Sequence, residues 1–366
     1  MLCVKNNTNN PYFNTAAEEY ILENFDDEHI FMLWQNEPCV YLGIHQNAYA
    51  EINLDYARIN NINVVRRLSG GGCVYHDMGN INFSFFSDLS NSADSTNLSD
   101  SADLSGKANK SEEYILNFEY YTRSVINALK NLGVNAELIG RNDLLIDGMK
   151  FSGNAQCLYT TKTRNPGKKK LLHHGTILFD ADMSKLAQVL TVDEEKIKSK
   201  SVKSVKSRVT NVLEQLSYDK KMSAEQFKNY LENYIISENE NNCKIYNFSS
   251  EDIKNIQYLA DNYYYTPSFI YGSNLKYSFR NKKRFDFGTI EICFNVRDYK
   301  ITDAKIYGDF FTGTENIETL EVYLNGISHE IGILQETLCS YFDKSGTDIG
   351  AFIKGCDIDT FIGLFI

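Results

Sequence analysis

The sequence of 366 residues lacks any run of eighteen apolar residues, so we expect no transmembrane helix. Its first residues, Met1–Asn7, show neither the apolar core of a signal peptide nor the arginine-rich pattern of a transit peptide. The eight cysteines are scattered and none forms a Cys-x-x-Cys pair, which argues against a zinc ribbon and a redox dithiol. Reduced thiols are typical of the cytoplasm, and we expect a cytoplasmic protein.

The sequence also has fewer basic than acidic residues. The chain has 37 Lys and Arg residues against 48 Asp and Glu residues, giving a formal net charge of −11 at pH 7. No overall positive field is available to attract phosphates, so we expect no nucleic-acid partner, although this leaves room for a local basic pocket. The length favours two or three domains, and we expect a monomer without membrane contact.

Several segments show the spacing of amphipathic helices. Residues 12–24 form the first, with Asn14 or Thr15 expected as its N-cap and Glu18 placed to complete a capping box with Thr15. Further helices are predicted over residues 51–60, 112–132, 183–190 and 223–236.

Apolar runs separated by turn residues predict β-hairpins. The runs Ile30–Trp34 and Cys39–Ile44 flank a polar Asn-Glu-Pro segment and are expected to pair. Asp147-Gly148 is a strong signal for a two-residue turn, which places Lys150 at the start of the returning strand. A second hairpin turns at Asn165-Pro166-Gly167.

The remaining segments suggest how the chain divides into domains. Residues 88–110 are rich in Ser, Asp and Asn and carry too little apolar surface to fold, so we expect a flexible insertion. We expect a catalytic domain over 1–240, an α+β accessory domain over 245–345 and a tail or helix over 346–366. In the accessory domain, strands are predicted over 263–265, 269–272, 284–287, 289–297 and 304–311, and helices over 316–325 and 329–342.

The stretch Arg66–Asn80, with the sequence RRLSGGGCVYHDMGN, is the most informative part of the chain. Glycine loses more backbone entropy than other residues, so three in a row suggest that another group approaches the backbone closely. Their N–H groups can line an anion, and Arg66 and Arg67 add fixed positive charge. The glycines alone favour a simple turn, but the flanking residues favour a site for a phosphate or carboxylate.

This string resembles the signature of the lipoate–protein ligases, and later segments resemble further motifs of that family. The matching segments are Gly140–Leu144, Lys150–Ala155, His173–Leu178 and Ser204–Asn211, while Arg284-Phe285 and Gly308–Phe311 resemble the accessory domain of the bacterial-type enzymes. The resemblance implies an α+β fold like that of the biotin and lipoate ligases. Such a fold has mixed, largely antiparallel sheets with flanking helices, plus a small α+β C-terminal accessory domain.

The resemblance implies that ATP activates lipoate, or octanoate, to an acyl-AMP, with Mg²⁺ as a cofactor. The acyl group would then pass to one lysine of a lipoyl carrier domain, either the glycine-cleavage H protein or the E2 subunit of a 2-oxoacid dehydrogenase. Two alternatives stay open: a lipoyl or octanoyl transferase that does not use ATP, and an inactive lipoyl-binding module.

The resemblance also assigns residues to roles. Lys150 is expected to be catalytic, because an ammonium that bridges a carboxylate and an α-phosphate neutralises their charge, although a lysine at a hairpin turn is by default exposed. ATP and adenylate would be bound by Arg67, Gly72, Cys73, Val74, Tyr75, Lys150, Lys206 and Arg208. Lipoate would be bound by Ser69, Gly70, Gly71, His76, Lys150, Gly153 and His174. Candidate metal ligands are Asp77, Asn80, Asn142 and Asp143.

Four side chains have competing interpretations. His173 and His174 are adjacent on a predicted strand and should point to opposite faces, so they are unsuited to one metal ion. His76 could contact the ligand or be a structural histidine. Cys157 suggests a thioester intermediate, but no His-paired thiolate environment is recognisable. The sequence reveals neither a covalent nucleophile nor a general base.

Overall fold

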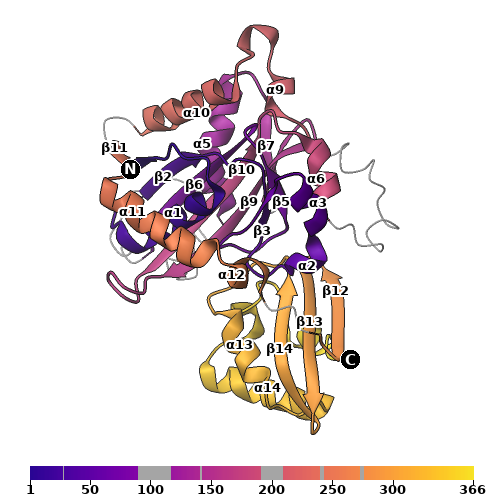
Figure 1. Cartoon of the computed structure of the whole chain (residues 1–366). Helices are drawn as coiled ribbons and strands as arrows, with labels where there is room; N and C mark the ends of the chain where they lie inside the picture. The colour runs from indigo at the N-terminus through magenta and orange to yellow at the C-terminus, as the bar shows by residue number, and fades with distance from the viewer. Residues whose placement is uncertain (28, 90–116, 141, 191–208, 240–242, 273–275) are drawn as a thin grey trace, which may run out of the picture.

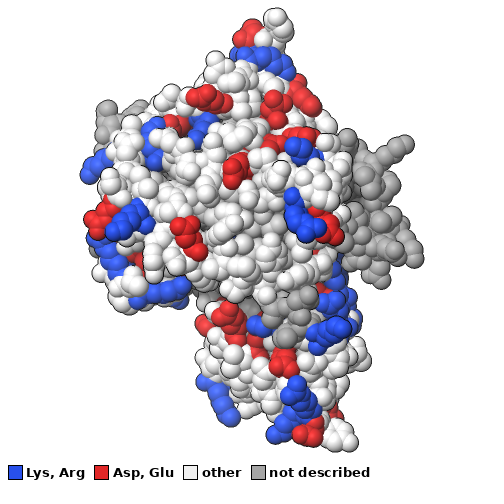
Figure 2. Space-filling view, in the orientation of Figure 1, with Lys and Arg blue, Asp and Glu red and all other residues white. Residues whose placement is uncertain are grey.

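The computed structural model describes residues 1–27, 29–89, 117–140, 142–190, 209–239, 243–272 and 276–366. Most of the predicted insertion 88–110 lies outside these ranges. Among the helices of the described ranges, none combines the length and the apolarity needed to span a membrane. On the described part of the face in Figure 2, basic and acidic side chains are interspersed rather than gathered by sign.

The largest sheet in the described part of the chain has eight strands and is mixed. The order is β11 (Lys244–Asn247), β1 (Leu2–Lys5), β2 (His29–Trp34), β6 (Asn80–Asp88), β10 (Lys169–Leu178), β9 (Met149–Thr160), β8 (Asp143–Ile146) and β7 (Ala136–Ile139). β1 is parallel to both β11 and β2, and every other neighbouring pair is antiparallel. The turn predicted at Asp147-Gly148 is confirmed, since both residues have positive φ, +50° and +77°.

A second, three-stranded sheet has the order β4 (Asn63–Arg66), β3 (Cys39–Leu42), β5 (Val74–His76). The predicted hairpin between Ile30–Trp34 and Cys39–Ile44 is therefore wrong, because β2 and β3 lie in different sheets. Both strands are almost entirely buried, and their partners are distant in the sequence: β2 pairs with β1 and β6, and β3 pairs with β4 and β5. Residues 67–73, called the glycine turn from here on, connect β4 to β5.

The first helix, α1 (Pro11–Asn24), begins earlier than its expected cap. Asn10 is the N-cap and accepts the backbone N–H groups of Tyr12 and Phe13, while proline occupies the first helical position. The capping box expected at Thr15 and Glu18 is wrong, because both side chains are fully buried against the sheets. The Glu18 carboxylate is therefore not used for capping and can form hydrogen bonds with buried side chains.

Helices cover both faces of the large sheet (Figure 1). α1 packs on one face through a cluster that contains Ile21 and Leu22. On the other face, α5 (Phe118–Asn131) and α10 (Ala224–Glu238) bury Val125, Leu129 and Leu231 against it. Shorter helices are α2 (Ala48–Glu51), α3 (Leu54–Ile59), α6 (Met183–Val189) and α9 (Val212–Gln215).

The strands predicted over 263–265 and 269–272 are wrong, because both segments consist of helical residues and the residue that follows each helix. α11 (Ser250–Leu259) continues into a π-helical turn (Ala260–Tyr264) and is followed by α12 (Pro267–Tyr271). Ser249 and Thr266 cap α11 and α12, and the apolar side chains pack on α1 rather than in a sheet. Local capping and this packing outweigh the β-propensity of the tyrosines.

The C-terminal module is a separate antiparallel sheet with helices on one face (Figure 1). Its strands are β12 (Phe279–Phe285), β13 (Gly288–Arg297) and β14 (Lys300–Gly308), and its helices are α13 (Ile317–Leu324), α14 (Ile331–Ser345) and α15 (Ile358–Ile362). Phe352, Phe361, Leu364 and Phe365 share one hydrophobic cluster with β13 and β14. We therefore propose that 346–366, expected as a separate tail or helix, belongs to the accessory domain.

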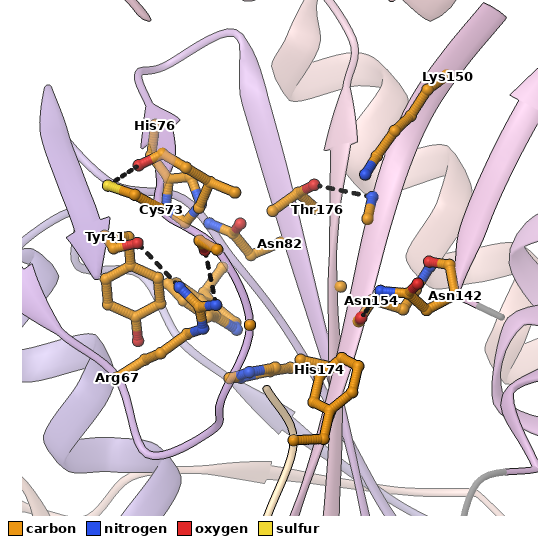
Figure 3. Close-up of a pocket in the computed structure, with 18 residues that line it drawn as sticks. Tyr41, Arg67, Cys73, His76, Asn82, Asn142, Lys150, Asn154, His174 and Thr176 are labelled. Atoms are coloured by element: carbon orange, nitrogen blue, oxygen red, sulfur yellow. Dashed lines mark hydrogen bonds between the residues drawn. The ribbon is translucent and has the colours of Figure 1, made fainter. Parts of the chain in front are cut away.

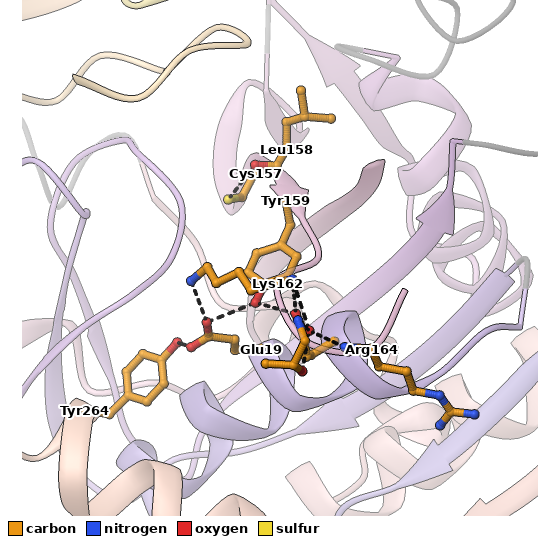
Figure 4. Close-up of polar contacts among 9 residues, drawn as sticks. Glu19, Cys157, Leu158, Tyr159, Lys162, Arg164 and Tyr264 are labelled. Carbon is orange, nitrogen blue, oxygen red and sulfur yellow. Dashed lines mark hydrogen bonds and ion pairs between the residues drawn. The ribbon is translucent and has the colours of Figure 1, made fainter. Parts of the chain in front are cut away.

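Two carboxylates of α1 tie this helix to neighbouring elements. Glu19 accepts the Tyr264 hydroxyl at 2.5 Å and the Tyr159 hydroxyl at 3.1 Å, and Lys162 Nζ lies 3.4 Å from it (Figure 4). One turn later, Glu23 accepts three backbone N–H groups and one hydroxyl from residues 162–164 of the β9–β10 hairpin. Together, these bonds anchor that hairpin.

Replacing Glu23 by Gln should lower the free energy of unfolding by about 1 kcal/mol at pH 7. Partial burial opposes ionisation of Glu23, but the hydrogen bonds from Thr163, Lys162 and Tyr159 together outweigh it and lower its pKa to about 2. The wild-type advantage should be complete above the ordinary pKa of 4.5 and disappear as the pH falls toward 2. Urea unfolding at several pH values measures it, and a difference that does not depend on pH would contradict this assignment.

Candidate active site

A cavity of about 190 Å³ lies where the glycine turn, β9 and β10 meet (Figure 3). In the figure, Arg67 and His76 lie on one side of it, and Lys150 and Asn154 lie on the other. The sequence-predicted residues that line it are Arg67, Gly71, Gly72, Cys73, Val74, His76, Asn142, Lys150, Gly153 and His174. Residues more than a hundred positions apart in the chain thus share one site.

Other predicted residues lie behind this lining or outside it. Ser69, Gly70 and Asp143 contact lining residues without lining the cavity themselves. Tyr75 is buried in an apolar cluster with Val40 and Ile52. Lys206 and Arg208 lie outside the described residues, and their roles stay a prediction.

The glycine turn needs its glycines for two different reasons. Gly71 has a φ of +94°, a conformation that residues with a Cβ rarely adopt. A Cβ on Gly70 would lie 2.3 Å from the carbonyl oxygen of Phe310, so the accessory module could not approach this closely. The turn is therefore shaped both by its own backbone and by the neighbouring module.

Arg67 holds the turn together from the inside. Its guanidinium donates to the carbonyl oxygens of Tyr41, Gly70 and Gly72 at 2.7–2.9 Å, and to Ser69 Oγ at 3.1 Å. The side chain is only 6% exposed. Arg67 thus fixes the conformation of the glycine turn at the wall of the cavity.

Arg66 has a structural position and does not line the cavity. It donates to five carbonyl oxygens, three in the loop 43–46 and two in α12, those of Phe269 and Ile270. It therefore ties the segment that precedes the accessory module to the catalytic core. Of the two arginines that the sequence offers to an anion, only Arg67 reaches the cavity wall.

Lys150 reaches the cavity from the first residues of β9 (Figure 3). Its Nζ lies 2.7 Å from Asp143 Oδ1 and close to the backbone of Gly153, where a Cβ would come within 3.1 Å of it. The Thr210 N–H donates to the Lys150 carbonyl oxygen at 2.9 Å, so the segment Val209-Thr210 lies beside this lysine. The ammonium and the glycine turn face one cavity.

His76 lines the cavity and carries a buried hydrogen-bond donor that has no partner among the described residues. The Asn36 amide donates to His76 Nδ1 at 3.1 Å, so the ring proton is on Nε2. Burial, and then the neighbouring Arg67 and His174, lower the pKa of His76 to about 3, so the ring is neutral at pH 7. Within the described residues, His76 Nε2, Asn82 Nδ2 and Asn154 Oδ1 are buried without a hydrogen-bond partner. Such atoms require a polar partner, and all three residues line the cavity.

The two adjacent histidines of β10 point to opposite faces, as predicted. His174 lines the cavity and contacts Ser69 and Glu18. His173 lies on the other face, where its ring packs against Phe118 and stacks on Tyr121.

Two of the four candidate metal ligands fit a magnesium ion at this cavity. Mg²⁺ is usually held by one or two carboxylates together with substrate phosphates. Asn142 lines the cavity and Asp143 contacts Lys150, which suits that arrangement. Asp77 instead accepts the N–H groups of Gly79 and Asp182, and Asn80 donates to Asn82. Among the described residues, no group of three His, Cys, Asp or Glu side chains could hold a metal alone.

Cys157 has the properties of a structural thiol. It does not line the cavity, and its Sγ contacts the Leu158 carbonyl oxygen at 3.6 Å. Burial, followed by the nearby Glu18 and Glu19, raises its pKa to about 12, so the reactive thiolate is suppressed. This environment argues against the thioester hypothesis.

Several residues of the site were not among the site residues predicted from the sequence. Tyr41, Trp34, Asn82 and Phe311 line the cavity, and Glu18 contacts His174. Trp34 is the single tryptophan of the chain, and Phe311 ends the motif Gly308–Phe311, so each carried a weak signal. The others gave none, because only the tertiary fold brings them to the glycine turn.

The accessory module reaches the cavity through Phe310 and Phe311. The ring of Phe310 stacks on His45 with 5.0 Å between centroids, and its carbonyl oxygen accepts the Gly71 N–H at 3.4 Å. Phe311, the next residue, lines the cavity itself. Both parts of the chain thus build the site.

Comparison with known protein families also divides the chain into two parts. Residues 10–236 match the family model described as the lipoyl protein ligase A/B catalytic domain, and residues 274–364 match that of the bacterial lipoate protein ligase C-terminus. The chain is 37% identical over 337 residues to "Lipoate--protein ligase 1" of Staphylococcus aureus, covering 92% of each chain.

Two solved structures share the fold. The crystal structure of P. falciparum LipL1 in complex with lipoate has a TM-score of 0.71 at 24% identity, covering 94% of this chain and 97% of that one. A bipartite lipoate protein ligase from Thermoplasma acidophilum, studied with its E2 lipoyl domain, has a TM-score of 0.58 at 26% identity, covering 76% and 98%.

The fold and the cavity define an enzyme of the ligase class with a catalytic core and a C-terminal accessory module. The chain belongs to the lipoate–protein ligase family. The predicted α+β fold of mixed, largely antiparallel sheets is confirmed.

Proposed function

We propose that this ligase activates lipoate, or octanoate, with ATP and then transfers the acyl group to a lysine of a lipoyl carrier domain. The observation that carries the proposal is that Lys150, the glycine turn and His76 face one cavity. This arrangement offers a cation, backbone N–H groups and a neutral donor to a phosphate and a carboxylate.

In the first step, a carboxylate oxygen of lipoate attacks the α-phosphorus of ATP, and the bond to pyrophosphate breaks. Two anions must meet, so the ammonium of Lys150 is placed to neutralise both the carboxylate and the α-phosphate. This requires Lys150 to exchange its 2.7 Å contact with Asp143 for the substrates, or to share it with them. His76 Nε2–H is proposed as a further donor to the phosphate or the acyl carbonyl.

In the second step, the uncharged amine of the carrier lysine attacks the acyl carbon, and AMP leaves. This produces an amide without a covalent acyl-enzyme, which is consistent with the raised pKa of the Cys157 thiol. Mg²⁺, held by Asp143 and Asn142 together with the phosphates, would neutralise charge on the leaving pyrophosphate. Lys206 and Arg208 precede Val209, which pairs with Lys150, so we propose that they also contact phosphates.

The carrier is proposed to be an E2 lipoyl domain or a glycine-cleavage H protein. The Thermoplasma ligase, at 26% identity, is described with an E2 lipoyl domain, which supports the first choice. Incubating the enzyme with lipoyl-AMP and either apo carrier, followed by mass spectrometry, distinguishes them.

Lipoate-dependent exchange between ATP and labelled pyrophosphate tests the activation step. We expect exchange that needs lipoate and Mg²⁺. If exchange is absent while lipoyl-AMP is still transferred to a carrier, the protein is a transferase that does not activate lipoate. If neither reaction occurs, it is an inactive lipoyl-binding module.

A further inference from the structure

A chain of buried hydrogen bonds runs behind the cavity wall and ends at Arg67. At one end, Trp34 Nε1 donates to Ser84 Oγ at 2.8 Å, and Ser84 Oγ donates to Glu18 Oε1 at 2.6 Å. The same carboxylate oxygen lies 2.9 Å from His174 Nδ1. Four elements, α1, β2, β6 and β10, contribute to it.

The other half of the chain passes from His174 to the glycine turn. His174 Nε2 lies 2.6 Å from Ser69 Oγ, and Arg67 Nε donates to the same hydroxyl oxygen at 3.1 Å. Glu18, Ser69 and Ser84 are at most 1% exposed, and His174 and Arg67 are each 6% exposed. The Glu18–His174–Ser69 chain therefore lies in the protein interior, with His174 at the cavity wall.

The N–H donors at the two ends of this hydrogen-bond chain determine which atom donates in every bond between them. Indole and guanidinium N–H groups can only donate, so both serine oxygens accept from them and each serine has one proton left to donate. Ser84 gives its proton to Glu18. Ser69 gives its proton to His174 Nε2, since its other acceptor, the Gly70 carbonyl oxygen, is more distant at 3.3 Å. His174 therefore carries its proton on Nδ1 and donates it to Glu18.

This order of Ser, His and a carboxylate is that of a nucleophilic triad, but the position of Ser69 excludes that role. Its side chain does not line the cavity, and its oxygen already accepts a hydrogen bond from Arg67. No acyl group could reach it without dismantling the turn. The role of this hydrogen-bond chain must therefore concern Arg67, the residue at its end.

A buried cation is costly unless charge compensates it. The direct partners of the Arg67 guanidinium in the described structure are carbonyl and hydroxyl oxygens, which carry no full charge. Glu18 is the carboxylate to which the hydrogen bonds connect it, through His174 and Ser69. Burial lowers the pKa of Arg67, and Tyr41, Cys73 and then Glu18 oppose that lowering.

We propose that Glu18, His174 and Ser69 are positioning residues that hold Arg67, and through it the glycine turn, in the geometry needed for acyl-AMP formation. The proposal rests on the proposed function, because it assigns a role in that same step. Glu18 supplies the compensating charge. His174 and Ser69 link it to Arg67 through hydrogen bonds whose donors and acceptors are fixed. A shift of Arg67 by about 1 Å would misplace the turn, which can cost about 10²-fold in rate.

Two substitutions of Glu18 separate its charge from its hydrogen bonds. Glu18→Gln keeps an acceptor oxygen but removes the charge, and we expect acyl-AMP formation to slow about 10-fold. Glu18→Leu removes both, and we expect a loss of about 10²-fold. The matched control is Glu23→Gln on the same helix, which should lower stability but leave the rate unchanged.

The tautomer of His174 provides a second readout that a general loss of stability would not change in this way. Nitrogen-15 NMR of histidine-labelled protein, assigned with a His174→Gln variant, should show the proton on Nδ1 in the wild type and in Glu18→Gln. In Glu18→Leu it should move to Nε2. Should Glu18→Leu fail to fold, Ser69→Ala should slow acyl-AMP formation about 10-fold and keep the proton on Nδ1.

A wild-type proton on Nε2, or Glu18 variants with the wild-type rate, would overturn the proposal. The NMR measurement needs no activity. If the wild type forms no acyl-AMP while His174 shows the expected tautomer, the proposed function fails and the hydrogen-bond chain stands as a structural device.

Discussion

Replacing Lys150 by Ala reduces lipoyl-AMP formation by about 10³-fold and leaves the protein folded. Removing one preorganised donor from an enzyme site costs about 10²–10³-fold, and a full positive charge between two anions is at the upper end of that range. The fold should tolerate the change, because the side chain is 40% exposed and its ion pair with Asp143 is at the protein surface. Pyrophosphate exchange measures the rate, and circular dichroism checks the fold.

Lys162→Ala is the matched control for this prediction. Lys162 also forms an ion pair, with Glu19 at 3.4 Å, but its side chain is 71% exposed and it lies two residues beyond the far end of β9. Its exchange rate should equal that of the wild type. A Lys150→Ala enzyme that retained exchange within about 3-fold of the wild type would remove Lys150 from the chemistry, since an electrostatic role predicts a loss of at least about 10²-fold.

Acidification should destabilise the folded protein steeply, starting near pH 6.5. Burial, then His174, lowers the pKa of His173 well below 6.5, and burial with Arg67 and His174 lowers that of His76 to about 3. The unfolded chain binds protons at these rings below pH 6.5 while the folded protein does not. Stability therefore falls as pH decreases from 6.5 toward 3, by up to about 1.4 kcal/mol per pH unit for each ring.

Urea unfolding between pH 7.5 and about 4 measures this loss, and the slope gives the number of protons taken up. At its steepest, the two rings together should contribute about 3 kcal/mol per pH unit, a large fraction of the stability of an ordinary domain. A His173→Gln variant should show a slope smaller by about one proton. Stability that stays constant from pH 6.5 to 4 would show that these rings are accessible to protons in the folded state.

The parts of the site that could be predicted from sequence are those encoded in contiguous residues. The glycine turn carries its own signals, because Gly71 needs a positive φ and Gly70 allows a close approach. The Asp147-Gly148 turn likewise determined where Lys150 begins its strand. Alternation along β10 was enough to separate His173 from His174.

The parts that were missed depend on tertiary contacts. Glu18 was interpreted as a capping residue, because helix spacing does not reveal that this face of α1 is buried against Ser84 and His174. The prediction that β2 and β3 form a hairpin was wrong, because the polar segment between two strands does not reveal whether both strands belong to the same sheet. A strand was predicted for the tyrosines at 263–265, although Tyr264 packs with α1 in one apolar cluster and Ala260–Tyr264 form a π-helical turn.

The account depends on the Lys150 ammonium meeting a carboxylate and a phosphate above the glycine turn. A crystal structure with a non-hydrolysable analogue of lipoyl-AMP tests it most directly. We predict the analogue in the cavity, with Lys150 Nζ within about 3 Å of the bridging oxygens between the acyl and phosphate groups. An analogue bound elsewhere, with Lys150 paired only with Asp143, would contradict the account.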